Sequence, residues 1–139
     1  MQQEMHEFRF HTTGPGASDI TDEVRAWVRD SGIQQGLLTL HVMHTSASLI
    51  VQENADPQVL DDMEAFLRRL VPPGDRIFRH TAEGDDDMPA HVRSALTSTT
   101  LSLPVSNGAP ALGIWQAIYL YEHRDLPHHR TIAAHLLGQ

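Results

Sequence analysis

The sequence predicts an α+β fold of mainly antiparallel sheets, arranged like a sandwich and packed with two to three helices. Helical periodicity of apolar residues is confined to three segments, while most of the remaining chain has the composition of strands. The strands and helices are also mixed without the strict alternation that is typical of a doubly wound parallel sheet. With 139 residues, 40% of them apolar, the chain is long enough for one core, so we expect a single domain over residues 1–139.

The first third of the chain predicts a strand, a turn and a helix. Residues 5–13 alternate loosely between apolar and polar side chains, which indicates a strand, and the Gly-Pro-Gly sequence within 12–16 indicates a turn. A helix is expected over residues 21–31, with Gly32 as its stop. Its apolar stripe comprises Ile20, Val24, Trp27 and Val28.

The middle of the chain predicts two extended segments and a second helix. Residues 36–44 and 46–52 are rich in residues that favour strands. The second helix opens with Asp56 as its N-cap and Pro57 at its first position, and the Pro-Pro sequence at 72–73 ends it. Its apolar stripe comprises Val59, Leu60, Met63, Phe66, Leu67 and Leu70.

The last half of the chain predicts one more helix and several strands. Residues 76–80 are expected to be extended, residues 84–87 to form an acidic loop, and Pro89 to lie in the first turn of a helix that reaches about Ser98 and has an Asp as its cap. Three further strands are expected over residues 99–105, 111–122 and 130–137, with a turn at 106–108 between the first two.

The composition excludes several kinds of function. The chain has no cysteine, so it has no disulfide, no cysteine nucleophile and no cysteine-ligated zinc. All ten basic residues are arginine, which excludes a Schiff-base or phosphate-loop lysine. A net charge of −8 argues against nucleic acid as the main partner. The sequence has neither an apolar run long enough to span a membrane nor a signal-peptide pattern, so we expect no membrane partner and a cytoplasmic location.

Histidine and carboxylate side chains are therefore the expected chemistry, because the chain has ten histidines. His44 ends a predicted strand and is followed by three hydroxyl residues, and His123 follows the long predicted strand. Asp87 and His91 are four residues apart at the opening of the third helix, where they can share a face. An alternative is open for each motif: a surface histidine with turn-forming hydroxyls at His44, an acidic, solvated loop that caps a helix at Asp87 and His91, and a charged strand exit at His123. The remaining histidines are expected at the surface or in packing roles: His6, His11, His41, His128, His129 and His135.

Five motifs resemble those of the YjbQ-like family, whose members are often labelled secondary thiamine-phosphate synthases. They are His44-Thr45-Ser46-Ala47-Ser48, Glu53-Asn54-Ala55-Asp56-Pro57, Asp86-Asp87-Met88-Pro89-Ala90-His91, Gly113-Ile114-Trp115-Gln116 and Glu122-His123-Arg124-Asp125. They cover nearly the whole chain in order. The resemblance implies an α+β fold, a homotrimer with sites near subunit boundaries, and a metal or ligand site built from the histidines of these motifs.

We accordingly predict that four histidines converge on a divalent metal, zinc or magnesium: His44, His80, His91 and His123. Glu53, Asp87 and Arg124 are the expected catalytic residues, and Thr45, Ser46 and Asn54 the expected cofactor-binding residues. The expected partner is a small phosphorylated metabolite.

Three functions are compatible with these residues. The first, implied by the resemblance, is a transferase that joins hydroxymethylpyrimidine diphosphate to thiazole phosphate, as a side activity of the family. Asp86 and Asp87 would hold magnesium, and the leaving diphosphate would be stabilised by arginines, for which the candidates are Arg79, Arg93 and Arg124. The second is a zinc-dependent hydrolase of a small phosphate or ester, with Glu53 or Asp87 as the base. The third is a non-catalytic metal- or ligand-binding module.

Overall fold

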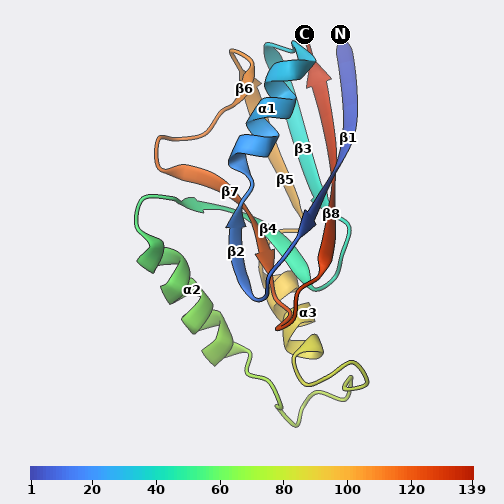
Figure 1. Cartoon of the computed structure of the whole chain (residues 1–139), viewed down its shortest axis with the longest axis vertical. Helices are drawn as coiled ribbons and strands as arrows, with labels where there is room; N and C mark the ends of the chain where they lie inside the picture. Colours follow the sequence, from blue (N-terminus) through green and yellow to red (C-terminus); the bar gives the residue numbers. More distant parts are fainter.

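The computed structural model describes residues 1–139 and has the predicted α+β fold with antiparallel sheets (Figure 1). A five-stranded sheet has the strand order β1-β8-β3-β5-β6, and a three-stranded sheet has the order β2-β7-β4. The strands are β1 Gln2–His11, β2 Gly16–Asp19, β3 Gln35–Val42, β4 Ala47–Glu53, β5 Thr100–Ser106, β6 Ala109–Pro110, β7 Gln116–Glu122 and β8 His129–Gly138. The helices are α1 Thr21–Ser31, α2 Pro57–Leu70 and α3 Asp87–Leu96.

The hydrophobic core is one cluster of 16 buried residues that draws on both sheets and on α1. The helix α1 has the predicted bounds, and Gly32 closes it in a left-handed conformation with φ of 78°. Val24 and Val28, from its predicted stripe, are fully buried. Removal of this apolar area from water is the main stabilising term for the domain.

The helix α2 also has its predicted start, since the Asp56 side chain accepts a hydrogen bond from the Gln58 N–H. In Figure 1 this helix lies to one side of the sheets. Only Leu67 of its apolar stripe is buried, and Phe66 and Leu70 stay more than half exposed. The apolar face of α2 is therefore only partly covered within one chain.

The structure corrects four local predictions. Residues 16–19, of which the prediction places Gly16 in a turn and the rest in no element, form the strand β2, which is too short to show periodicity. Residues 76–80 form no strand, because the Asp75 side chain accepts from the Ile77 N–H and turns the chain. The strand β7 starts at residue 116 rather than 111, since Gly113 and Gln116 bond to each other across a turn.

The fourth correction is that Asp87 belongs to the helix α3 rather than to the preceding loop, and that this helix ends at Leu96. Because the helix begins at Asp87, Pro89 lies in its first turn as predicted. Proline fits there because the N–H groups of the first helical turn have no partner within the helix. Asp86 stands at the N-cap position, but its side chain makes no capping hydrogen bond. Its carboxylate instead accepts from Arg124 Nε and from the Asp125 N–H.

The strand register brings the chain segments that carry most of the predicted motifs to one end of the molecule. Ala47 and Gly16 both pair with Glu122, so β4 and β2 begin where β7 ends. The start of β8 and the end of β3 lie at the same end, where Val42 pairs with Ile132. The helix α3 lies beside this end, at the bottom of Figure 1. No helix is both long and apolar enough to cross a membrane.

Candidate functional site

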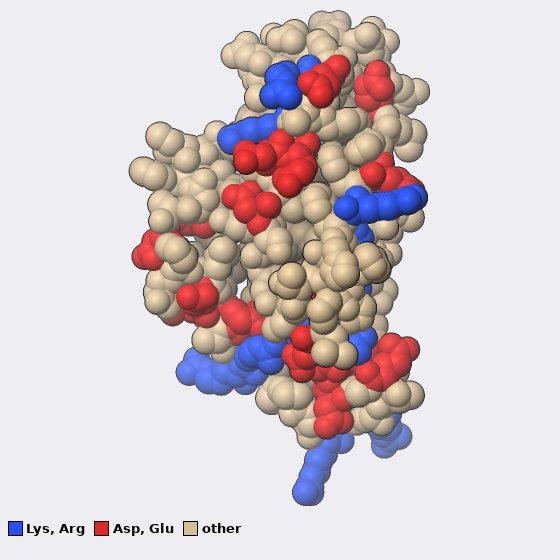
Figure 2. Space-filling view, viewed as in Figure 1, with Lys and Arg blue, Asp and Glu red and all other residues tan.

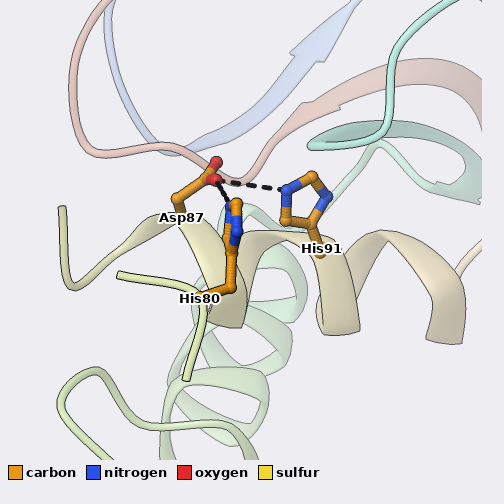
Figure 3. Close-up of side chains that lie close together, drawn as sticks. All are labelled: His80, Asp87 and His91. Carbon is orange, nitrogen blue, oxygen red and sulfur yellow. Dashed lines mark hydrogen bonds and ion pairs between the residues drawn. The ribbon is translucent and has the colours of Figure 1, made fainter. Parts of the chain in front are cut away.

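Three side chains of the predicted set meet at the start of α3 (Figure 3). Asp87 is the first residue of this helix, and His91 follows one turn later on the same face. His80 comes from the loop between α2 and α3. Its Nε2 lies 2.6 Å from Asp87 Oδ2, and His91 Nε2 lies 3.2 Å from the same oxygen. One ligand atom from each of the three residues lies within 4.8 Å of the others.

The orientation of His91 is fixed by the backbone of the segment after β3. Its Nδ1 lies 3.0 Å from the Thr45 carbonyl oxygen, which can only accept, so Nδ1 carries a proton. In the neutral ring Nε2 is then a lone pair that faces the Asp87 carboxylate. Two acceptors at 3.2 Å repel each other unless a proton or a cation lies between them. A proton or a metal cation between His91 Nε2 and Asp87 Oδ2 would therefore remove this repulsion.

Asp87 is held in position by a second partner. Its side chain is only 3% exposed, and its Oδ1 lies 2.9 Å from Arg124 Nη1. Burial alone would raise the pKa of Asp87, but the His80 hydrogen bond and the charges of His91 and Arg124 outweigh burial and lower this pKa. Asp87 is consequently ionised at neutral pH.

Both acidic and basic side chains surround this cluster. Arg124 also bonds Asp86 Oδ2 through Nε and the Glu83 carbonyl through Nη2. Figure 2 shows acidic and arginine side chains together over the lower end of the molecule, where α3 and the preceding loop lie in Figure 1. Each of the three guanidinium nitrogens of Arg124 thus contacts a neighbouring oxygen, and two of these contacts hold the carboxylates of Asp86 and Asp87.

An open pocket of about 270 Å³ adjoins the cluster. It is lined by His44, Thr45, His91, Ser94, Ala95 and Thr99. His91 is common to the pocket and the cluster. A slightly larger pocket of about 310 Å³ lies along α2, but its lining contains no histidine and only one acid, Asp62. The pocket beside His91 is the better candidate for a ligand site, because ligand sites combine a cavity with convergent polar groups.

His44 lies two residues beyond the end of β3 rather than on it. Its Nε2 accepts a hydrogen bond of 2.8 Å from the Thr131 N–H. Burial and the charge of Arg130 lower the pKa of His44, so the ring is neutral at neutral pH. His44 reaches the pocket but is not among the three side chains whose ligand atoms meet.

His123 is buried away from the cluster. It is 1% exposed, its Nε2 lies 2.8 Å from Ser48 Oγ, and its Nδ1 has no partner. Burial and the charge of Arg93 lower its pKa to about 3, so the ring is neutral. The single-chain structure does not bring His123 into the predicted four-histidine set, because its side chain turns into the interior as β7 ends.

The other predicted residues lie in three different places. Ser46 is buried and accepts from Arg130, which also pairs with Glu122, so its role within the chain is structural. Glu53 and Asn54 lie at the far end of β4, where Glu53 pairs with Gln116 while Ala47 pairs with Glu122. Six strand residues span about 20 Å, which separates Glu53 from the cluster within one chain. Thr45 contributes both its carbonyl and a place in the pocket wall.

Three pocket residues were not predicted from the sequence: Ser94, Ala95 and Thr99. The first two follow His91 by three and four residues on α3, so helical periodicity contains the signal that would have found them. Thr99 reaches the pocket only through the way that the chain returns from α3 to β5.

Comparisons with known proteins agree on one family. A sequence model described as "UPF0047 protein YjbQ-like" matches residues 6–139. A UPF0047 protein from Synechocystis is 49% identical over 92% of this chain and 87% of its own length. The UPF0047 protein YjbQ of Escherichia coli O157:H7 is 45% identical over 86% of this chain and 87% of its own length.

Solved structures show the same fold. A protein from Aeropyrum pernix superposes with a TM-score of 0.88 at 30% identity, covering 98% of this chain and 99% of that one. A protein from Thermus thermophilus superposes with a TM-score of 0.84 at 36% identity, covering 95% of this chain and 99% of that one. The chain therefore belongs to the UPF0047 family of YjbQ-like proteins.

Proposed function

We propose that this chain is a metal-dependent enzyme that acts on a small phosphorylated metabolite, with His80, Asp87 and His91 as the metal ligands. The observation that carries the proposal is the contact of two imidazoles with one buried, ionised carboxylate beside an open pocket. Second partners orient the ligands: the Thr45 carbonyl holds His91, and Arg124 holds Asp87. Such outer partners are typical of metal-binding histidines and carboxylates.

The donor set favours a zinc-like ion over magnesium. Imidazole nitrogens suit zinc and other transition metals, whereas magnesium prefers oxygen ligands and keeps several waters. Asp86 and Asp87 do not form a free oxygen pair for magnesium, because both are bound to Arg124. When bound, the metal would polarise a phosphoryl or ester oxygen and activate water.

Hydrolysis of a small phosphate or ester is the reaction that this geometry supports best. Three protein ligands leave room for water and substrate, as in catalytic zinc sites. The hydroxyls of Thr45 and Thr99 in the pocket wall are available to bind the substrate. Glu53 is too distant to act as the base within one chain, so that role would require a neighbouring chain.

The second candidate is the thiamine-phosphate synthase-type transfer, for which the free guanidinium of Arg79 beside His80 is the favourable observation. Arg79 is exposed and makes no ion pair. The other two predicted arginines have different roles: Arg93 is buried against the Val71 and His123 carbonyls, and Arg124 is bound by acids. Stabilisation of a leaving diphosphate would therefore depend on Arg79 and the metal.

Elemental analysis of protein purified without an affinity tag tests the metal centre. We expect about one zinc per chain in the parent protein, and loss of most of it in His91→Ala and His80→Ala, because each change removes one of three protein ligands. His129→Ala is the matched control, since His129 is exposed and lies outside the cluster. Full metal content in His91→Ala would overturn the proposed centre.

A turnover screen separates the reactions. The metal-loaded protein is offered a library of phosphate esters, and separately the pyrimidine diphosphate with the thiazole phosphate. Release of phosphate that is lost in His91→Ala supports hydrolysis, and formation of thiamine phosphate supports transfer. If neither product forms in the parent protein, the result favours the third function, a non-catalytic metal- or ligand-binding module.

We also propose that the chain assembles as a homotrimer. Ile114 and Trp115 are largely exposed, as are Phe66 and Leu70 of α2, which is unusual for large apolar side chains. The strands β1, β2 and β4 are also edges of their sheets. Neighbouring chains would cover such edges and apolar surfaces.

A further inference from the structure

At the end of the five-stranded sheet, the side chain of His44 accepts a hydrogen bond that a backbone carbonyl would otherwise accept. The ladder between β3 and β8 runs to Val42 and Ile132, and the Met43 N–H still donates to the Thr131 carbonyl. The next group on this edge is the Thr131 N–H, and its acceptor is His44 Nε2 at 2.8 Å instead of another carbonyl. The imidazole ring is thus fixed by the strand end.

This bond decides the tautomer of His44. A backbone N–H can only donate, so Nε2 must carry a lone pair. A neutral imidazole carries its one proton on the other nitrogen, which is Nδ1. Nδ1 has no hydrogen-bond partner elsewhere in the chain. In this state neither nitrogen has a free lone pair for a metal, and His44 offers one N–H donor.

The pocket that His44 lines contains two further unused donors. Thr45 and Thr99 both line it, and neither hydroxyl has a partner within the chain. The Ser94 hydroxyl, by contrast, donates to the Ala47 carbonyl at 3.1 Å. No carboxylate lines the pocket. His44 Nδ1 can only donate, and the two threonine hydroxyls can each donate as well, so a ligand rich in acceptor oxygens matches these three groups.

We propose that this pocket is a phosphoryl subsite in which His44 donates a hydrogen bond from Nδ1, and that His44 is not a metal ligand. Three donors, from His44, Thr45 and Thr99, match the three non-bridging oxygens of a phosphate monoester. The volume of about 270 Å³ lies just below the usual range for ligand pockets, which suits one small group rather than a whole nucleotide. This inference deepens the proposed function and rests on it only for the metal beside the subsite.

Two substitutions of His44 separate the roles. His44→Gln keeps an amide oxygen to accept from Thr131 and an amide N–H to donate, while His44→Leu keeps neither. We expect both variants to retain metal at the parent level, unlike His91→Ala. In calorimetric titration with inorganic phosphate, His44→Leu should bind about tenfold to a hundredfold more weakly than the parent, and His44→Gln within a few fold of it. Metal loss in His44→Leu that matches His91→Ala would show His44 to be a ligand and overturn the proposal, as would unchanged phosphate affinity.

The tautomer is a separate test that needs neither metal nor activity. Long-range ¹H–¹⁵N spectra of the metal-free parent protein distinguish the protonated ring nitrogen from the lone-pair nitrogen. We expect His44 Nδ1 to be the protonated one, and a ring protonated at Nε2 would overturn the proposal even if His44→Leu fails to fold. If the parent binds no metal but phosphate binding still depends on His44, the metal centre fails and the subsite stands.

Discussion

Asp87 lies at the centre of the candidate site because its two carboxylate oxygens contact different partners. Oδ2 contacts both histidine nitrogens, and Oδ1 pairs with Arg124. A buried carboxylate that lost the Arg124 partner would be free to rotate and would face a larger cost of burial. The sequence predicts a catalytic role for Arg124, whereas its contacts in one chain make it a positioning residue for Asp87.

Substitution of Arg124 by Gln should weaken metal binding. The expected loss is about tenfold to a hundredfold in affinity, the usual effect when an outer partner of a metal ligand is removed. Competition with a chromogenic chelator measures this affinity. Arg25→Gln is the matched control, because Arg25 is exposed on α1 and makes no ion pair. Unchanged affinity combined with lost turnover would instead support the catalytic role predicted from the sequence.

At the scale of the elements, α3 carries most of the site. Asp87, His91, Ser94 and Ala95 follow one another at helical spacing, so a single helix presents two of the three proposed metal ligands and part of a pocket wall. Ser94 fixes this helix to the sheet by donating to the Ala47 carbonyl at the start of β4. The position of the site therefore depends on how α3 docks at the end of the three-stranded sheet.

The N-cap of α2 gives a prediction about element stability. The Asp56 carboxylate accepts from the Gln58 N–H at 3.0 Å, so Asp56→Ala should lower the free energy of unfolding by about 1 kcal/mol. Asp61→Ala, on the same helix but without a side-chain bond, should change it by less than about 0.5 kcal/mol. Urea unfolding followed by circular dichroism measures both. An equal effect of the two substitutions would mean that the cap does not stabilise the helix.

The elements with a clear period could be predicted from the sequence, and those set by distant contacts could not. The bounds of α1 and α2 follow from their apolar stripes and end signals. The strand β2 has only four residues and exists because β7 offers it an edge. In the site, the spacing of Asp87 and His91 predicts their pairing. The burial of His123 depends on the direction in which the chain leaves β7, and the distance from Glu53 to the cluster depends on the register of β4 and β7. Local sequence patterns encode neither of them.

At the scale of the whole molecule, exposed apolar side chains point to assembly. Trp115 is 59% exposed beside Ile114, at the end of β7 opposite the cluster of His80, Asp87 and His91. Glu53 and Asn54 lie at that same end. A neighbouring chain that covers this region would place its own side chains against Glu53 and Asn54.

Light scattering coupled to size exclusion should therefore give three times the 15.5 kDa mass of one chain. Trp115→Ser should reduce the trimer fraction at low micromolar concentration, because buried aromatic residues dominate interface energies. Arg25→Ser is the control, since Arg25 is exposed on the helix α1 and is neither apolar nor on a sheet edge. A parent protein that elutes as a monomer would contradict the proposed assembly.

The buried, neutral His123 should make the whole fold sensitive to acid. Its pKa falls from 6.5 to about 3 on folding, so between these values the unfolded chain binds the additional proton. Stability from this residue is complete above the unfolded pKa and is lost as the pH drops toward the folded one. The expected slope is about 1.4 kcal/mol per pH unit from this group, largest where the unfolded histidine is protonated. His44, whose pKa is also lowered, adds to the slope in the same direction.

Urea unfolding of metal-free protein at several pH values, from about 7 to about 5, measures this slope. In His123→Gln the side chain can still bond Ser48 but cannot take up a proton, so the slope should fall by the contribution of one proton. His135→Gln is the matched control, because His135 bonds Gln3 at the edge of the five-stranded sheet and lies outside the core. The control should keep the parent slope. If His123→Gln also keeps it, the ring of His123 is protonated equally in the folded and unfolded chain, and its burial against Ser48 and Tyr121 does not exclude the charge.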